Sequence, residues 1–208
     1  KGAFSNYKSN LASIRTSTFK REEALRVLLE LAGDAPVVST TGKTSREVFE
    51  LRAERQEAQR DFLTVGAMGH TLSIALGVAM GQPDKRVVCL DGDGSVLMHL
   101  GALPIMASVK PDNLVHVLLN NAAHESVGGQ PTVADQVDFK ALALACGYQG
   151  YAQAHDIESL KVAWSSVTRQ SGPVLLEIKI ATGSRENLGR PSSPPSENKK
   201  AFMEWVAK

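Results

Sequence analysis

Polar residues and glycines directly follow three strongly apolar segments of this 208-residue chain, at residues 40–42 (TTG), 91–95 (DGDGS) and 120–121 (NN). Either of the last two groups alone is weak evidence, because Asp-Gly and Asn residues are common in turns. The 25 residues from 95 to 119, however, are enough for one crossover helix and one returning strand. Since ligands bind beyond the carboxyl ends of parallel strands, we expect the two groups to be neighbours in one site.

The side chains of these two groups are suited to a metal ion and a phosphate. Asp93 offers a carboxylate and Asn121 an amide oxygen, which are hard ligands that Mg²⁺ takes together with phosphate oxygens. Gly92 and Gly94 permit backbone conformations that let a ligand approach closely. Ser95 is expected to begin a helix whose free N–H groups receive a phosphate. The pattern therefore predicts a site for Mg²⁺ and a diphosphate.

Alternating strands and helices must position this site. The strand segments are continuously apolar, which is typical of a parallel sheet covered on both faces. We predict one α/β domain over residues 21–181, an open parallel sheet with helices on both faces, between an N-terminal arm or linker (1–20) and a C-terminal tail and helix (182–208). The expected strands are 35–40, 85–94, 113–121, 148–152 and 173–180, and the expected helices are 21–32, 41–54, 65–81, 95–109, 138–146, 156–170 and 199–208.

The composition excludes several classes of protein. A hydrophobic content of 43% and a charged content of 22% exclude disorder over the whole chain. A formal net charge of +1 offers no field that would recruit nucleic acid or an anionic membrane. No apolar run approaches the ~20 residues of a membrane-spanning helix. Cys89 and Cys146 lie in apolar segments, which favours reduced core thiols and a cytoplasmic protein.

The sequence GDGS at 92–95, followed by NN at 120–121, resembles the diphosphate-anchoring motif of thiamine-diphosphate-dependent enzymes, and the resemblance extends over about residues 21–181. It implies that thiamine diphosphate and Mg²⁺ are the cofactors. It also implies that Asp93, Asn121 and the backbone carbonyl of Ala123 are the metal ligands. The further cofactor-binding positions that it implies are Thr41, Gly42, Lys43, Gly92, Gly94 and Ser95 at the diphosphate, and Gly66, Ala67 and Met68 at the aminopyrimidine ring, with Met68 as an apolar support.

Three longer stretches extend the resemblance: TTGKTSRE (40–47), GAMGHTLSIALG (66–77) and NNAAHESVGGQPT (120–132). They are similar to phosphonopyruvate decarboxylases and, nearly as well, to the β subunits of sulfopyruvate decarboxylases. Both kinds of enzyme decarboxylate a 2-oxo acid that carries an anionic group at C3. The resemblance thus implies decarboxylation of 3-phosphonopyruvate to phosphonoacetaldehyde and CO₂, with 3-sulfopyruvate as the alternative substrate.

Two histidines are the candidates for acid–base chemistry. His124 lies in the loop directly after the expected metal ligands, where Ser126 can add a hydrogen bond. His70 follows the expected ring-binding segment, and a buried structural role is an equal alternative for it. Lys43 either meets an anion or is a solvated residue at a helix start. In the polar tail, the guanidinium groups of Arg185 and Arg190 would suit a phosphonate, with an ordinary surface role as the alternative.

The family resemblance also points to a missing part. Thiamine enzymes use a glutamate on a separate pyrimidine-binding domain, for which 208 residues leave no room. We therefore expect half of a catalytic unit, in an oligomer whose partner is an α subunit or an N-terminal half of the same polypeptide. A non-catalytic cofactor-binding subunit remains an alternative.

Two nucleotide-binding motifs can be set aside. A Rossmann dinucleotide domain is disfavoured because TTGKTS, and not G-x-G-x-x-G, follows the first strand. A P-loop is disfavoured because Val37 stands where that motif requires glycine.

Overall fold

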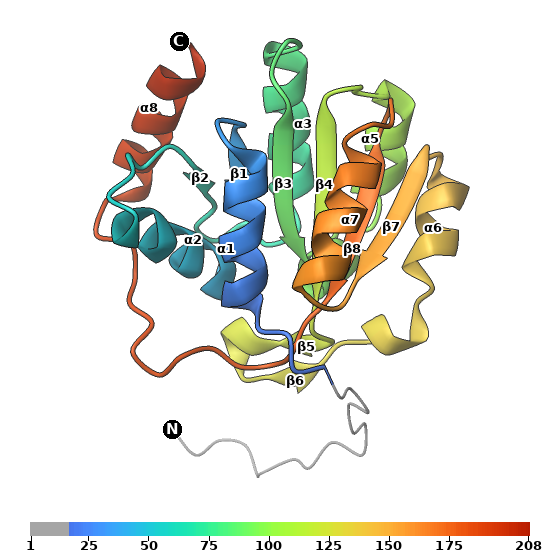
Figure 1. Ribbon diagram of the computed structural model, residues 1–208, viewed down its shortest axis with the longest axis horizontal. Coiled ribbons are helices and arrows are strands. Elements are labelled where there is room, and N and C mark those ends of the chain that lie inside the picture. Colours follow the sequence, from blue (N-terminus) through green and yellow to red (C-terminus); the bar gives the residue numbers. More distant parts are fainter. Residues whose placement is uncertain (1–16) are drawn as a thin grey trace.

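Six parallel strands form the central sheet of the structure, a computed structural model that describes residues 17–208 (Figure 1). Every residue of the first and fourth strands is buried, which explains their nearly continuous apolar sequences. The order across the sheet is β2-β1-β3-β4-β8-β7, and the bounds are Val37–Ser39 (β1), Phe62–Leu63 (β2), Val87–Gly92 (β3), Leu114–Asn120 (β4), Gly150–Ala154 (β7) and Val174–Lys179 (β8).

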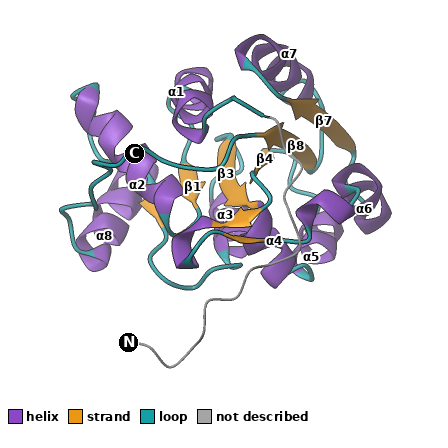
Figure 2. Cartoon of the chain, turned by 90° about the horizontal axis from the view of Figure 1, so that it is seen from below, coloured by secondary structure: helices purple, strands orange, loops and turns teal. Residues whose placement is uncertain are grey.

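Helices cover both faces of the sheet, as Figure 2 shows along the carboxyl edge. One core cluster holds the apolar residues of α1 (Arg21–Ala32), α2 (Lys43–Glu54) and α7 (Ile157–Val167). The second cluster holds those of α3 (Thr71–Gly81), α5 (Ala102–Val109), α6 (Phe139–Cys146) and α8 (Pro195–Val206). The prediction of an open parallel sheet covered on both faces is confirmed.

Two predicted helices differ from the observed ones. The helix expected over 65–81 begins only at Thr71, because Gly66, Ala67 and Gly69 have φ values of 68, 47 and 89°, which a right-handed helix does not allow. The helix expected over 95–109 is divided into α4 (Asp93–Met98) and α5, with Gly101 in the break. Ser95 therefore lies inside a six-residue helix and does not begin it.

The shortest elements carry no periodicity that a sequence pattern could reveal. They are β2 and the antiparallel pair β5 (Ala123–His124) and β6 (Gln130–Pro131), with two residues each. Two three-residue 3₁₀ turns, Glu125–Val127 and Ala134–Gln136, flank β6. The last helix begins at Pro195, earlier than the expected residue 199, with proline in its first turn.

The first described residues pack onto the end of β8. Phe19 is buried, and its carbonyl accepts a hydrogen bond from the Ala181 N–H (2.8 Å). The Ser17 hydroxyl donates to the Lys179 carbonyl (3.1 Å). The rest of the expected arm, residues 1–16, lies outside the described residues. Among the described helices, none has the length and apolar character needed to span a membrane.

Candidate functional site

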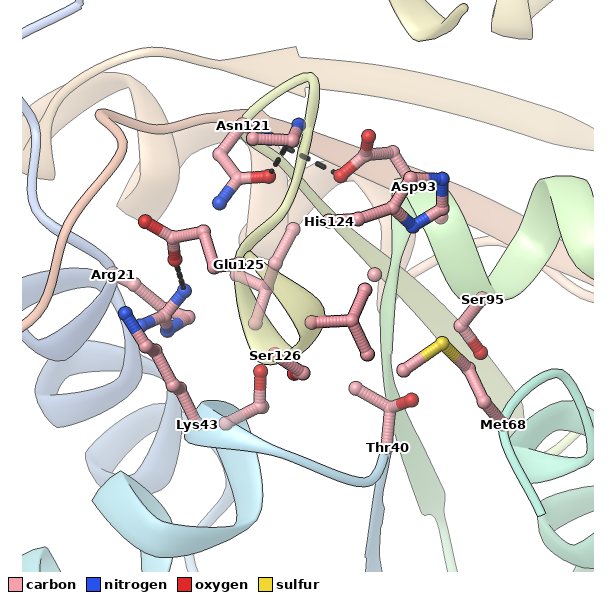
Figure 3. Close-up of a pocket in the computed structure, with 16 residues that line it drawn as sticks. Arg21, Thr40, Lys43, Met68, Asp93, Ser95, Asn121, His124, Glu125 and Ser126 are labelled. Carbon is pink, nitrogen blue, oxygen red and sulfur yellow. Dashed lines mark hydrogen bonds and ion pairs between the residues drawn. The ribbon is translucent and has the colours of Figure 1, made fainter. Parts of the chain in front are cut away.

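A pocket opens at the carboxyl edge of the sheet, where β1, β3 and β4 end (Figure 3). It holds about 490 Å³ of space, including its open mouth. Nine of the expected metal-binding, cofactor-binding and catalytic residues lie in its wall. These are Lys43, Met68, Gly92, Asp93, Gly94, Ser95, Asn121, Ala123 and His124. The wall also contains Ser126 and six further residues, Arg21, Thr40, Thr44, Leu119, Glu125 and Val127.

Asp93 and Asn121 come together as their places at two strand ends require. In the parallel pair β3–β4, Gly92 lies opposite Leu119, so the next residues of each strand leave the sheet side by side. The Asp93 Oδ1 lies 3.4 Å from the Asn121 N–H, and both side chains are buried. The other oxygen of Asp93 accepts a hydrogen bond of 2.5 Å from the Thr132 hydroxyl. The Asp93 carboxylate therefore lies against the Asn121 backbone, and both residues line the pocket (Figure 3).

The two asparagines have different surroundings. Asn121 lines the pocket, and its Oδ1 accepts a hydrogen bond from the Ala123 N–H (3.0 Å). Ala122 between them has φ 54°, a left-handed conformation that turns the chain sharply at this point. Asn120 is fully buried, and its amide donates to Glu177 on β8 (2.6 Å). Asn120 thus anchors the end of β4 to the sheet, while Asn121 faces the site.

Glu177 is the buried carboxylate on which this anchor depends. It accepts hydrogen bonds from Asn120 and from the Tyr151 hydroxyl (2.5 Å), and it forms an ion pair with Lys179. Burial alone would raise the pKa of Glu177, but these bonds outweigh it and hold the pKa below its ordinary value. The same burial and bonding raise the pKa of Tyr151 well above its ordinary value.

We expect Glu177→Gln to lower the free energy of unfolding at pH 7 by ~1.5–3 kcal/mol, the range for hydrogen bonds to charged groups. Because the native pKa is lowered, the contribution of Glu177 is complete above its unfolded pKa of about 4.3 and is lost as pH falls through the native value. Urea unfolding of both proteins between pH 7 and 3 should show the difference shrinking in acid. The exposed Glu158→Gln, which loses a surface pair with Lys161, is the matched control. An equal loss in the two variants would contradict this account.

The turn at residues 66–69 is fixed by side chains of the neighbouring strand ends. The Gly66 N–H donates to the Thr41 hydroxyl (3.1 Å), and the Gly69 N–H donates to the Ser95 hydroxyl (3.1 Å). Met68 is half-buried and lines the pocket. Thr41, which is expected at the diphosphate, is not among the residues of the pocket wall, and its hydroxyl holds this turn. Its neighbour Thr40 lines the pocket in its place.

His124 and His70 lie in different surroundings. The His124 ring packs directly over Gly94, where an added Cβ would lie 2.5 Å from the ring Nδ1. Glycine at position 94 is thus required for His124 to take its place in the pocket. His70 is exposed, lies outside the described pocket wall, and packs its ring at 4.7 Å from that of His99. The structure therefore brings His124, and not His70, beside the two candidate metal ligands.

Lys43 is the first residue of α2 and lies on the same side of the pocket as Arg21 (Figure 3). Gly42 before it has φ 99°, and the Ser126 side chain fills the space where a Cβ at this glycine would lie. Gly42, Gly66 and Ala67 themselves are not in the pocket wall. Thr40 also lines the pocket, and its buried Oγ1 has no hydrogen-bond partner among the described residues.

Arg21, Glu47 and Glu125 form a buried ionic cluster that sequence reasoning did not find. The Arg21 guanidinium contacts both carboxylates. Burial would lower the pKa of Arg21, but these bonds outweigh it and hold the pKa above its ordinary value. Burial raises the pKa of Glu47, although the bonds from Arg21 oppose it. Glu47 and Glu125 are 26 and 104 residues away from Arg21 in the sequence, so no local sequence pattern links the three residues.

Other polar residues singled out from the sequence have structural partners. Arg185 pairs with Glu22 and Glu50 and lies outside the wall of the site pocket. Cys89 is buried and Cys146 half-buried, and both are free thiols. Burial raises the pKa of Cys89 well above its ordinary value, so it stays a protonated core thiol.

The residues present fit a Mg²⁺-bound diphosphate. Asp93 and Asn121 supply two of the oxygen ligands that Mg²⁺ prefers. Thr40 offers an unpartnered buried hydroxyl, and Lys43 a cation, for the phosphate oxygens. Gly92 lies in the pocket wall, and the nearest atom to a Cβ added there would be Thr40 Cγ2 at 3.9 Å. The space beside Gly92 is therefore open to a ligand. These side chains therefore suit a phosphate anion that is bound together with a small divalent cation.

Comparisons with known proteins agree with this geometry. The family model "Thiamine pyrophosphate enzyme, C-terminal TPP binding domain" matches residues 40–178. Phosphonopyruvate decarboxylases of Streptomyces viridochromogenes and Streptomyces hygroscopicus are each 43% identical over 181 residues, which is 87% of this chain. The chain spans 44% of the length of these two relatives.

Two further similarities involve a shorter relative and a solved structure. The sulfopyruvate decarboxylase subunit beta of Methanothermobacter thermautotrophicus is 35% identical over 80% of this chain and 85% of its own length. A solved structure described as a thiamin diphosphate-dependent enzyme from Mycobacterium smegmatis superposes with a TM-score of 0.66. It is 23% identical and covers 79% of this chain and 32% of that chain, so this likeness shows the fold alone.

Proposed function

Since the chain belongs to the thiamine pyrophosphate enzymes, as their C-terminal TPP binding domain, we propose that it is the diphosphate-binding half of a 2-oxo acid decarboxylase. The proposed substrate is 3-phosphonopyruvate, and the products are phosphonoacetaldehyde and CO₂. The observation that carries this choice is the 43% identity to two phosphonopyruvate decarboxylases over most of the chain. The 35% identity to a sulfopyruvate decarboxylase subunit beta favours 3-sulfopyruvate as the second candidate.

The chain's own residues have definite tasks in this proposal. Asp93 and Asn121 bind Mg²⁺ through their side chains, and the backbone carbonyl of Ala123 is the third protein ligand. Thr40 and Lys43 bind the diphosphate oxygens. Met68 supports the rings of the cofactor from the opposite wall. Bound thiamine diphosphate supplies the carbon nucleophile and accepts the electrons that the departing CO₂ leaves behind.

His124 is the proposed proton donor of the site. Its ring lies over Gly94 at the pocket, next to the candidate metal ligands, and it is half-buried. After CO₂ has left, the substrate carbon needs a proton before the aldehyde is released, and an imidazole within the pocket is suited to deliver it. Thr41 and Ser95 also hold the turn that carries Met68, and Ser95 in addition lines the pocket.

A partner completes the proposed enzyme. The pocket lies open at the sheet edge, and the chain spans less than half the length of the phosphonopyruvate decarboxylases. We infer that a pyrimidine-binding domain, on a separate subunit or on the same polypeptide, covers the pocket and supplies the activating glutamate. Covering the pocket also excludes water, which favours loss of the substrate's carboxylate charge.

The test is CO₂ release by the assembled protein, with thiamine diphosphate and Mg²⁺, from 3-phosphonopyruvate and 3-sulfopyruvate side by side. We expect kcat/KM to be at least ~10-fold higher for the phosphonate, since its additional charge can engage a further cationic contact. A preference for the sulfonate would transfer the assignment to the second candidate. Release from neither substrate, with the glutamate-bearing partner present, would instead support a non-catalytic cofactor-binding subunit.

A further inference from the structure

Arg21 is a buried cation that joins four parts of the molecule. It is the first residue of α1, and its Nε and Nη2 donate to the two carboxylate oxygens of Glu47 on α2, at 2.7 and 3.0 Å. Its Nη1 donates to Glu125 at 2.6 Å, and its Nη2 also reaches the Gly183 carbonyl at 3.4 Å. The side chain is only 5% exposed, so these bonds lie largely out of water.

Glu125 belongs to the site loop, which we define as residues 122–131. One of its carboxylate oxygens accepts from Arg21, and the other accepts from the Gly183 N–H. Within the described residues, the loop's own backbone bonds are few: β5 pairs with β6 over two residues, the Gly129 N–H donates to the His124 carbonyl (3.0 Å), and the Thr132 N–H donates to the Ala122 carbonyl (2.9 Å). Its tip is exposed, with Val127 at 66%. The bonds of Glu125 are therefore a principal anchor of the loop.

The position of Glu125 determines the position of His124, its neighbour in the chain. The His124 ring packs directly over Gly94, so a small rotation of the loop would move it off its place in the pocket. Arginine suits this task because its planar fork reaches Glu47 and Glu125 at once. A lysine, with one point charge, cannot keep both contacts. Figure 3 shows Arg21 and Glu125 joined on the side of the pocket opposite Met68.

The positive charge of Arg21 also helps to hold the site loop in place. Without it, the carboxylate of Glu125 would face the pocket that is proposed to hold a diphosphate, and like charges at such distances repel in a poorly solvated site. The ion pair with Arg21 neutralises this carboxylate, so the loop can lie over an anion.

We propose that Arg21 is a positioning residue, which by holding Glu125 fixes the site loop and so places His124 over Gly94. This inference rests on the proposed function in one respect only, the role of His124 in turnover. The holding of the loop itself is a property of the chain that does not depend on any substrate.

The main variant is Glu125→Ala, which leaves the buried Arg21–Glu47 pair intact and therefore does not threaten the fold. Arg21→Met is the second, and Glu125→Gln is the conservative variant, whose single amide oxygen can keep one of the two hydrogen bonds that Glu125 accepts. The matched control is Arg26→Met, which breaks an exposed pair with Glu54 between the same two helices. Hydrogen exchange of the Gly129 and Thr132 amides reports the loop, and CO₂ release by the assembled enzyme reports turnover.

We expect both amides to exchange ~10-fold faster or more in Glu125→Ala and Arg21→Met, and at the wild-type rate in Arg26→Met. We expect kcat to fall ~10- to 100-fold while the cofactor affinity changes less than ~3-fold, and Glu125→Gln, which keeps one of the two bonds, to lose less of kcat than Glu125→Ala does. The double variant should be no worse than the poorer single one, since both act through one contact.

Unchanged exchange in Glu125→Ala would overturn the proposal, and so would faster exchange with an unaltered kcat. Wild-type protein that releases no CO₂ from either substrate would refute the proposed function instead. In that case the exchange rates of the same variants still decide whether Arg21 holds the loop.

Discussion

Replacing Asp93 by Asn is expected to abolish the stabilisation that thiamine diphosphate and Mg²⁺ together give the assembled protein. Asp93 is the buried carboxylate at the β3 terminus, and Asn keeps its shape but removes the charge that balances Mg²⁺. A ligand at 100 times its Kd stabilises the folded state by ~2.7 kcal/mol, which corresponds to a rise in Tm of roughly 5–10 °C for a chain of this length. We expect this rise in wild type and none in Asp93→Asn, with turnover lowered by ~1,000-fold or more.

Asn121→Ala and Asp91→Asn provide the comparison for this result. Asn121→Ala removes the second metal ligand and should also lose most of the rise in Tm. Asp91 lies two residues before Asp93 but is buried below the pocket, outside its wall, with Oδ1 accepting from the Gly92 N–H (2.9 Å). Asp91→Asn should therefore lower the basal Tm while keeping the Mg²⁺-dependent rise. Full stabilisation of both Asp93→Asn and Asn121→Ala would refute the metal assignment.

Replacing His124 by Gln is expected to depress turnover much more than cofactor affinity. A positioned acid–base group contributes typically ~100- to 10,000-fold to a rate, and glutamine keeps a polar side chain over Gly94 without a group that can donate a proton at neutral pH. We expect kcat to fall ~100-fold or more, and the Kd of thiamine diphosphate to change less than ~3-fold. Steady-state rates of CO₂ release and calorimetric titration with the cofactor measure the two quantities.

His155→Gln is the matched control, because His155 lies on the surface with a side chain that is 72% exposed. It should leave both quantities unaltered. If His124→Gln instead weakened the binding of thiamine diphosphate and left kcat unchanged, His124 would be reassigned to cofactor binding. Of the two histidine candidates, His70 should give the smaller effect when replaced by Gln, because His70 is not in the pocket wall and its ring packs against His99.

The layers of the fold could be predicted because buried parallel strands and amphipathic helices have distinct sequence patterns. The apolar run of β4 is one example, and the helix expected over 21–32, observed as Arg21–Ala32, is another. The parts that were wrong depend on single backbone angles. Positive φ at Ala67 delays the start of α3, and the break after Met98 divides one expected helix into α4 and α5. The two-residue strands β2, β5 and β6 form only because their neighbours in space provide partners.

The site was predictable to the extent that its residues follow strand ends. Asp93 and Asn121 were expected side by side, and the register of β3 and β4 brings them together. Thr41 and Thr40 could not be told apart, because which of two adjacent residues faces a pocket depends on the strand's exact end. Arg21 and Glu125 were missed because an ion pair across 104 residues has no sequence signal.

Native mass spectrometry of the assembled protein, purified with thiamine diphosphate and Mg²⁺, measures directly whether Asp93 is needed to hold the cofactor and the metal ion. We expect a wild-type complex whose mass includes thiamine diphosphate and Mg²⁺ in equal amounts, and an Asp93→Asn complex of the same subunits that retains neither. A wild-type complex that holds no thiamine diphosphate at saturating Mg²⁺, or an Asp93→Asn complex that holds both as wild type does, would contradict this expectation.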